Sequence, residues 1–215
     1  LPEIPPSINA FLGQTVHESL EWLYKELMNG RGIDLDDLIM NFVQSWRENF
    51  SLEFKINGHE EFESFFNKGI KFLVNYYEKN KPFLDKTIHL EKKILFPLDK
   101  DGEYKIQGYI DRVVINKDGE YEVHDYKTND SLKTQKEIDQ DRQLAFYHLG
   151  LQELFGKSIK VKLVWHFLAH SQTIFSSRTQ EELDFLKQKT LELIKTIESN
   201  QEWPPCNKRW CDWCE

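Results

Sequence analysis

The sequence predicts an α/β fold in which a mixed central β-sheet is flanked by helices and preceded by a helical region. Three observations support this prediction. Apolar residues recur at helical spacing through the first third of the chain, and strand-like segments separated by turns follow between residues 87 and 128. The remaining segments alternate between helix, strands and helix. This order is typical of helices packed on the faces of one sheet.

Three helices are expected before the sheet. Apolar side chains repeat with helical spacing within residues 14–27, 35–50 and 60–79. We interpret residues 33–82 as a helical insertion within one domain that spans residues 1–205.

Three strands joined in a meander are expected at residues 87–98, 103–115 and 120–128. The sequence Lys-Asp-Gly-Glu-Tyr occurs in both connections, at residues 100–104 and 117–121. Asp and Gly favour tight turns because they tolerate backbone conformations that other residues avoid. The same turn is therefore predicted twice.

The rest of the chain is expected to contain a helix at residues 139–155, two strands at 159–166 and 172–176, and a final long helix. Thr179 and Glu182 have the spacing of a capping box, which places the start of that last helix. Three leucines of the helix at residues 139–155 are expected to face the core: Leu144, Leu151 and Leu154.

Composition excludes several classes of protein. Of 215 residues, 40% are hydrophobic and 13% aromatic, so intrinsic disorder is not the main state. No apolar run approaches the roughly 20 residues that span a bilayer, and a cytoplasmic protein without membrane contact is expected. The formal charge of −8 argues against a basic nucleic-acid coat. It does not argue against an enzyme that places metal ions beside phosphate. Because the chain begins at Leu1, we expect it to be a fragment.

Two carboxylates and a lysine are expected to meet on one face of two strands. Residues 117–119 fit a three-residue hairpin loop in which Gly119 takes the left-handed position. This loop would place Asp111 opposite Asp125, with Lys127 further along the same face. A loop of two or four residues would put the carboxylates on opposite faces instead.

These carboxylates are either part of a solvated strand surface or a metal site. Like charges opposite each other destabilise a sheet unless something compensates, and carboxylate oxygens suit Mg²⁺ or Mn²⁺. Val113 and Val123 lie on the same face as the charges, and a charged group on a buried face needs a partner. Near the metal, Lys127 can orient or deprotonate the attacking water or neutralise charge on a phosphate.

Five segments resemble, in order, the motifs of the PD-(D/E)xK nuclease superfamily. They are Gly13-Gln-Thr-Val-His17, Gly108-Tyr-Ile-Asp111, Asp125-Tyr-Lys127-Thr128, Gln143-Leu-Ala-Phe-Tyr147, and Cys211-Asp-Trp-Cys214 after Trp203-Pro204-Pro205. The resemblance is greatest for the RecB-like branch, which includes the CRISPR-associated RecB-like exonucleases and the AddB-type nuclease domains. It covers nearly the whole chain and implies a restriction-endonuclease-like core.

The resemblance implies a role for each residue of the first three motifs. Asp111 and Asp125 would bind the metal, and the carbonyl of Tyr126 would be a third ligand. His17 would complete the ligand set and make Mn²⁺ more acceptable. Lys127 would be the catalytic lysine.

The resemblance implies that Gln143 and Tyr147 support the active site and contact DNA. They lie four positions apart and so share one face of a helix, a spacing that ordinary packing at a helix edge would also explain. Glu91 falls on the first strand, where many relatives carry a glutamate, and no catalytic role is assigned to it.

The cysteines all lie in the last ten residues, as Cys206, Cys211 and Cys214. An odd, clustered set is a poor disulfide framework and favours metal binding in a reducing compartment. The resemblance implies a [4Fe–4S] cluster bound by four cysteines, one of them upstream of the nuclease core. Residues 206–215 would supply only part of that cluster, and zinc or three reduced cysteines are the alternatives.

The predicted function is that of a metal-dependent deoxyribonuclease, with Mg²⁺ or Mn²⁺ as its cofactor. The resemblance points to an exonuclease on single-stranded DNA ends, in repair, recombination or CRISPR adaptation, beside a helicase or nuclease partner. The alternative is a catalytically silent module that binds DNA or protein within a helicase–nuclease assembly. Double-strand cleavage of the restriction type is a third option, although no base-recognition element is recognised.

Overall fold

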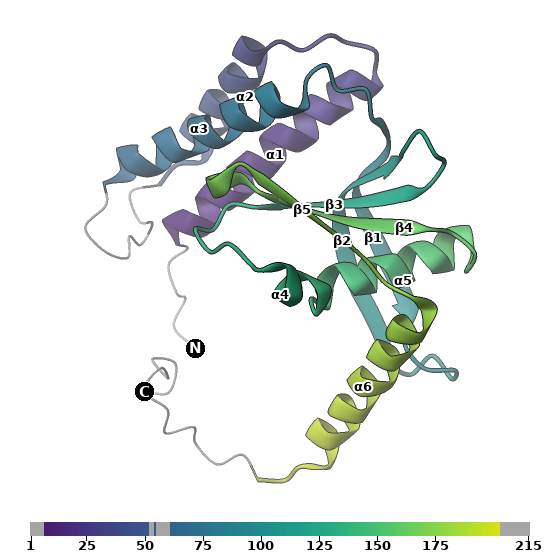
Figure 1. The fold of residues 1–215 in the computed structure, drawn as a ribbon. Coiled ribbons are helices and arrows are strands. Elements are labelled where there is room, and N and C mark those ends of the chain that lie inside the picture. The colour runs from purple at the N-terminus through teal and green to yellow at the C-terminus, as the bar shows by residue number, and fades with distance from the viewer. Residues whose placement is uncertain (1–6, 52–53, 55–60, 203–215) are drawn as a thin grey trace.

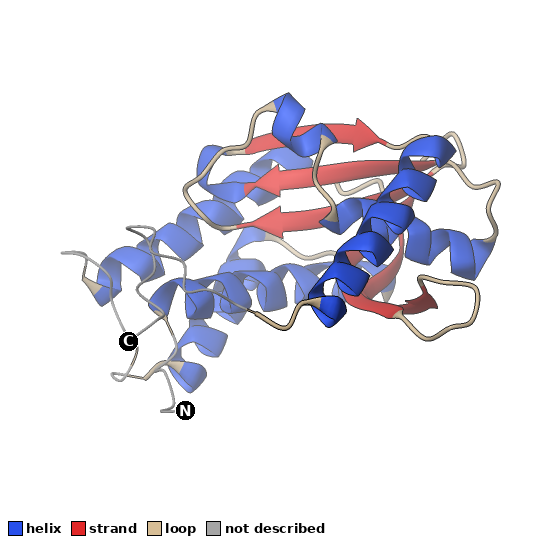
Figure 2. Ribbon diagram, turned by 90° about the horizontal axis from the view of Figure 1, so that it is seen from below, coloured by secondary structure: helices blue, strands red, loops and turns tan. Residues whose placement is uncertain are grey.

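The predicted fold class is confirmed by the computed structural model, which describes residues 7–51, 54 and 61–202. One five-stranded sheet has the order β1-β2-β3-β4-β5. Within it β3 and β4 run parallel, whereas the other neighbouring strands are antiparallel, so the sheet is mixed. Helices lie on both sides of the sheet (Figures 1 and 2).

Each strand begins and ends within two residues of its predicted position. Their bounds are Lys86–Pro97 for β1, Lys105–Ile115 for β2, Tyr121–Lys127 for β3, Val161–Phe167 for β4 and Gln172–Ser177 for β5. The first three form the predicted meander. The parallel pairing of β3 with β4 then requires a crossover connection.

The loop between β2 and β3 has the predicted length and turn. The amide of Asn116 donates to the carbonyl of Glu120 at 2.9 Å, and Gly119 has a φ of 79°. The strands pair in the predicted register, which brings Arg112 opposite His124. The paired residues end at Arg112 and His124, and Asp111 and Asp125 are the next residues in this register.

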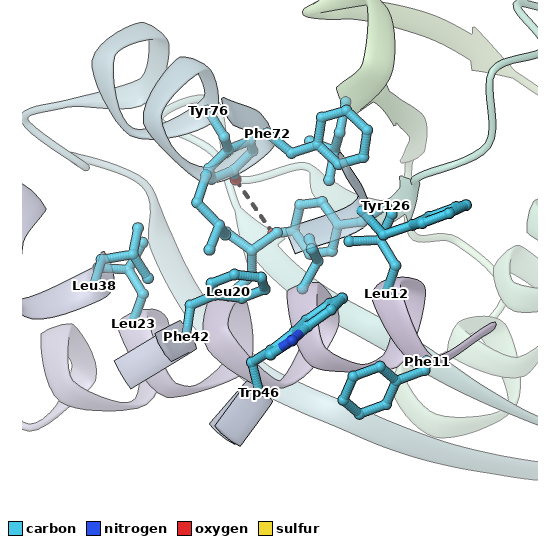
Figure 3. Close-up of a cluster of buried hydrophobic side chains, with 14 of the residues drawn as sticks. Phe11, Leu12, Leu20, Leu23, Leu38, Phe42, Trp46, Phe72, Tyr76 and Tyr126 are labelled. Carbon is cyan, nitrogen blue, oxygen red and sulfur yellow. Dashed lines mark hydrogen bonds between the residues drawn. The ribbon is translucent and has the colours of Figure 1, made fainter. Parts of the chain in front are cut away.

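Three helices pack together on one face of the sheet: α1 at Ile8–Met28, α2 at Leu35–Asn49 and α3 at Phe62–Asn80. Helix α1 begins earlier than predicted because the Ser7 side chain caps it by accepting from the amide of Asn9. Figure 3 shows the hydrophobic cluster that joins these helices to Tyr126 of the sheet. The cluster includes Leu12, Leu20, Leu23, Leu38, Phe42, Trp46, Phe72 and Tyr76.

The opposite face is covered by α5 at Gln143–Phe155, which is part of the crossover from β3 to β4. Val113 and Val123 are fully buried against it, as predicted for the face that carries the carboxylates. Helix α6, at Gln180–Ser199, begins with the predicted capping box of Thr179 and Glu182.

The helix predicted at residues 139–155 ends where predicted but begins four residues later, and a short helix that was not predicted precedes it. Helix α4 spans Gln135–Asp139, and α5 begins only at Gln143. Arg178 holds the chain in a turn between them by donating from Nη2 to the carbonyls of Ile138 and Asp141, at 2.8 and 3.2 Å.

Leu144 and Leu151 are buried as predicted, but Leu154 is exposed. Leu154 is turned by about 60° around the helix axis from Leu151, which takes it to the edge of the buried stripe. Within the described part of the chain, no helix is both long enough and apolar enough to cross a membrane.

Candidate active site

The predicted site residues come from four elements that meet near the C-terminal end of β3. His17 lies on α1, Asp111 on β2, residues 125–127 on β3, and Gln143 and Tyr147 on α5. Their side chains form two neighbouring groups, one around His17 and one around Lys127.

The first group joins α1 to the neighbouring strands β2 and β3. His17 Nε2 lies 2.8 Å from the carbonyl oxygen of Tyr126 and, since a carbonyl only accepts, the ring donates this hydrogen bond. In the neutral imidazole Nδ1 then carries a lone pair, and it lies 3.5 Å from Asp111 Oδ2. The same Asp111 oxygen accepts from the amide of Tyr126 at 2.9 Å. Acceptor atoms of His17 and Asp111 therefore face each other.

Glu91, to which the sequence assigned no role, belongs to this group. His17, Glu91 and Asp111 offer ligand atoms that all lie within 4.8 Å of one another. The backbone of Glu91 has a φ of 43°, and for a residue other than glycine this left-handed conformation costs about 1–2 kcal/mol. Such strain clusters at functional sites. The position of Glu91 on a strand gives no signal of this, because alternation says nothing about a positive φ.

The second group places Lys127 between a carboxylate and an amide. Its Nζ lies 2.7 Å from Asp125 Oδ2 and donates to Gln143 Oε1 at 2.9 Å. Gln143 Nε2 donates in turn to the Tyr147 hydroxyl at 3.1 Å. Apart from the ion pair, Asp125 Oδ2 has no hydrogen-bond partner among the described residues. The helix spacing of Gln143 and Tyr147 thus directs both side chains toward the lysine.

Burial leaves these carboxylates poorly compensated. Desolvation and the neighbouring Asp125 raise the pKa of Asp111 to about 7, although the Tyr126 amide and Lys127 oppose the shift. Burial likewise raises the pKa of Asp125 against the opposing effect of Lys127. Desolvation, together with Asp111, raises the pKa of Glu91. A cluster of acids with raised pKa values lacks positive charge.

The family model of the PD-(D/E)XK nuclease superfamily matches residues 1–215 of the chain. The chain belongs to this superfamily. No curated protein matches the chain closely enough to count as a relative. The nuclease superfamily predicted from the motifs is therefore confirmed, whereas the RecB-like branch stays a prediction.

The donor set of this nuclease fits a divalent cation, which nucleases of the superfamily typically use. Carboxylate oxygens suit Mg²⁺ or Mn²⁺, and an imidazole nitrogen favours Mn²⁺ over Mg²⁺. His17, Glu91 and Asp111 converge on one point, and a cation there would compensate Asp111, which burial has desolvated, and the exposed Glu91 beside it. Asp125 lies outside this converging group and is turned toward Lys127.

Gly108, in the same motif as Asp111, is needed for close packing beside the site. A Cβ atom at position 108 would lie 2.9 Å from Cε1 of Tyr147, closer than side-chain carbons approach each other. Any larger residue would push Tyr147 away from Gln143. Cys206, Cys211 and Cys214 lie outside the described residues, so the predicted cysteine cluster stays a prediction.

Proposed function

We propose that this nuclease is a metal-dependent deoxyribonuclease that works as an exonuclease on single-stranded DNA ends with Mg²⁺ or Mn²⁺. The observation that most supports it is the pairing of a buried acid with a lysine beside a converging set of metal-ligand atoms. Lys127 lies 2.7 Å from Asp125, and His17, Glu91 and Asp111 converge within 4.8 Å.

Asp111, Asp125 and His17 bind the cation in this proposal, with Glu91 and the carbonyl of Tyr126 as further ligands. A divalent cation bound there lowers the pKa of water and stabilises negative charge on the phosphate. The carboxylates must lose their protons to bind it, and the raised pKa of Asp111 makes that loss pH-dependent.

Lys127 acts on the attacking water and on the phosphate. Its ammonium donates to a phosphate oxygen or orients the water, and it neutralises charge that develops in the transition state. Gln143 fixes the position of that ammonium through its Oε1 atom. Tyr147 fixes Gln143 through its hydroxyl. The geometry thus supports a relay of positioning contacts from α5 to the lysine.

The finer parts of the proposal rest on the motif resemblance. They are the RecB-like branch, the single-strand preference, a helicase or nuclease partner, a place in repair, recombination or CRISPR adaptation, and a [4Fe–4S] cluster that includes Cys206, Cys211 and Cys214.

The decisive experiment incubates the chain with end-labelled single-stranded DNA and either Mn²⁺ or Mg²⁺, with EDTA as the metal-free arm. Lys127→Ala is expected to lower the cleavage rate by about 10²-fold or more, the scale of a positioned proton donor. Lys160→Ala is the matched control, since this lysine is 81% exposed and pairs only loosely with Glu120. Its cleavage rate is expected to stay at the wild-type value.

Labels at the 5′ or 3′ end and a circular substrate separate the modes of cleavage. An exonuclease leaves circular single-stranded DNA intact and gives a ladder whose direction reports polarity. Wild-type protein that binds Mn²⁺ but cuts neither substrate would contradict the enzyme and favour the silent binding module.

A further inference from the structure

A full charge is buried directly behind the candidate active site. Arg112 follows Asp111 on β2 and has an exposed fraction of 0%. Successive side chains of a strand point to opposite faces, and Arg112 points toward α1 and α3, away from the face of Val113. A buried charge is unfavourable unless its hydrogen bonds are satisfied. Its ion pair among the described residues is with Asp85, which is 54% exposed and 3.6 Å away.

The guanidinium is satisfied mainly by neutral side chains. Its Nε donates to the Tyr126 hydroxyl at 3.0 Å, Nη1 donates to Thr87 Oγ1 at 3.2 Å, and Nη2 donates to His124 Nδ1 at 2.9 Å. The guanidinium carbon also lies 3.9 Å from the centre of the Tyr24 ring. The planar guanidinium holds five N–H donors in fixed directions, whereas the compact ammonium of a lysine has three on a flexible stem.

Tyr126 joins this buried network to the active site. Its hydroxyl accepts from Arg112 and lies 3.2 Å from the hydroxyl of Tyr76 on α3. On the other side of the residue, its amide donates to Asp111 Oδ2 and its carbonyl accepts from His17 Nε2. The backbone of one residue therefore contacts both Asp111 and His17, through its amide and its carbonyl, while its side chain is fixed from behind.

We propose that Arg112 is a positioning residue that fixes the backbone of Tyr126 and, through its amide and carbonyl, the relative placement of Asp111 and His17. This inference rests on the proposed metal site. Residues that orient metal ligands from the next layer change metal affinity by about 10- to 100-fold when they are removed. Loss of the Arg112–Tyr126 contact should therefore weaken metal binding without removing any ligand.

A merely stabilising role would give a different pattern. Whole buried ion pairs are often replaceable by apolar residues without loss of stability, so stability alone says little about why a buried charge is present at position 112. If it only supported the fold, every variant of the cluster would lose stability and metal affinity together. If Arg112 positions Tyr126, metal affinity falls only in variants that alter the contact with Tyr126. Stability can fall in any variant of the cluster.

The test uses Tyr126→Phe and Arg112→Lys, with Tyr24→Phe as the matched control. The control removes a hydroxyl from the same buried cluster, since Tyr24 and Tyr76 share a hydrogen bond of 2.6 Å. It leaves the contact between Arg112 and Tyr126 in place. The free Mn²⁺ signal in electron paramagnetic resonance gives metal affinity, and thermal unfolding gives stability. NMR hydrogen exchange in EDTA reports on the amide of residue 126.

Tyr126→Phe and Arg112→Lys are expected to raise the Mn²⁺ dissociation constant by about tenfold or more. The amide of residue 126 should exchange faster in the metal-free protein. With DNA, kcat should fall while KM stays unchanged, because the substrate contacts are intact. Tyr24→Phe should keep wild-type Mn²⁺ affinity and wild-type exchange at residue 126, even if it lowers the unfolding temperature as much as Tyr126→Phe does.

Wild-type exchange and Mn²⁺ affinity in Tyr126→Phe would overturn the proposal. The proposal would also be overturned if Tyr24→Phe lost as much Mn²⁺ affinity and as much protection of the residue 126 amide as Tyr126→Phe. If the wild-type protein binds no Mn²⁺, the proposed metal site fails, and the exchange of the residue 126 amide still decides whether Arg112 positions that peptide.

Discussion

At the scale of single residues, the surroundings of Asp111 shift its pKa in opposite directions. Burial and the charge of Asp125 favour its protonated form, whereas the Tyr126 amide and Lys127 favour the carboxylate. The balance raises its pKa from 3.8 to about 7. Near neutral pH a cation must therefore compete with a proton for this side chain.

Replacing Asp111 with asparagine should make metal-free stability less dependent on pH. Because the folded-state pKa lies above that of the unfolded chain, protonation of Asp111 contributes stability below pH 4 that is lost as the pH rises toward 7. Asp111→Asn keeps an oxygen for the Tyr126 amide and has no charge to bury. In EDTA its unfolding temperature should rise relative to wild type between pH 5 and 8, by about 2–4 °C for each 1 kcal/mol.

Asp118→Asn is the control for this pH series, since Asp118 is exposed in the hairpin loop. Its unfolding temperature should follow that of the wild type at every pH. Parallel curves for Asp111→Asn and wild type would show that Asp111 has an ordinary pKa.

At the scale of elements, the hairpin could be predicted from sequence whereas the break before α5 could not. The β2–β3 register follows from local information, because Gly119 and the residues around it specify the loop. The end of α4 depends on Arg178, which lies 40 positions after Ile138 in the chain. The predicted helix at residues 139–155 runs across this turn, so the spacing of apolar residues indicates neither α4 nor the later start of α5. A role for Glu91 could not be predicted for a similar reason, since its partners His17 and Asp111 come from other elements.

Removing Arg178 should destabilise the junction between α4 and α5. Arg178→Met removes this donor from the carbonyls of Ile138 and Asp141, of which Ile138 still accepts from the amide of Asp141. Hydrogen bonds to a charged group contribute about 1.5–3 kcal/mol. Urea unfolding should show a loss of that size. Thr179→Ala, which removes only the cap of α6, should lose about 1 kcal/mol. Equal losses in the two variants would contradict a specific role for Arg178 at the junction.

At the scale of the whole molecule, three layers meet at one site. Helix α1 belongs to the helical layer and supplies His17, the sheet supplies the acids and Lys127, and α5 on the opposite face supplies Gln143. The order of these layers could be predicted from the alternation of helical and strand segments. The grouping of side chains into a converging triad and a separate Asp125–Lys127 pair depends on packing between layers, which no local pattern records.

Cation binding should stabilise the whole domain. A ligand that binds only the folded state adds about 2.7 kcal/mol at a concentration 100 times its dissociation constant, which corresponds to an increase of about 5–11 °C in unfolding temperature. Mn²⁺ should produce this increase at pH 8 and a smaller one at pH 5.5, where Asp111 is protonated. NaCl at matched ionic strength is the control, and an equal increase with NaCl would contradict a specific site.

The contact between His17 and Tyr126 joins residues that lie 109 positions apart. A ribosome that adds 5–20 residues each second makes His17 roughly 5–20 s before it makes Tyr126. Throughout that interval a nascent chain contains His17 but not the whole of β3, which carries Asp125, Tyr126 and Lys127. Growing chains thus lack the complete site until the meander is made and docked on α1, so nucleic acid meets this arrangement only in the finished fold.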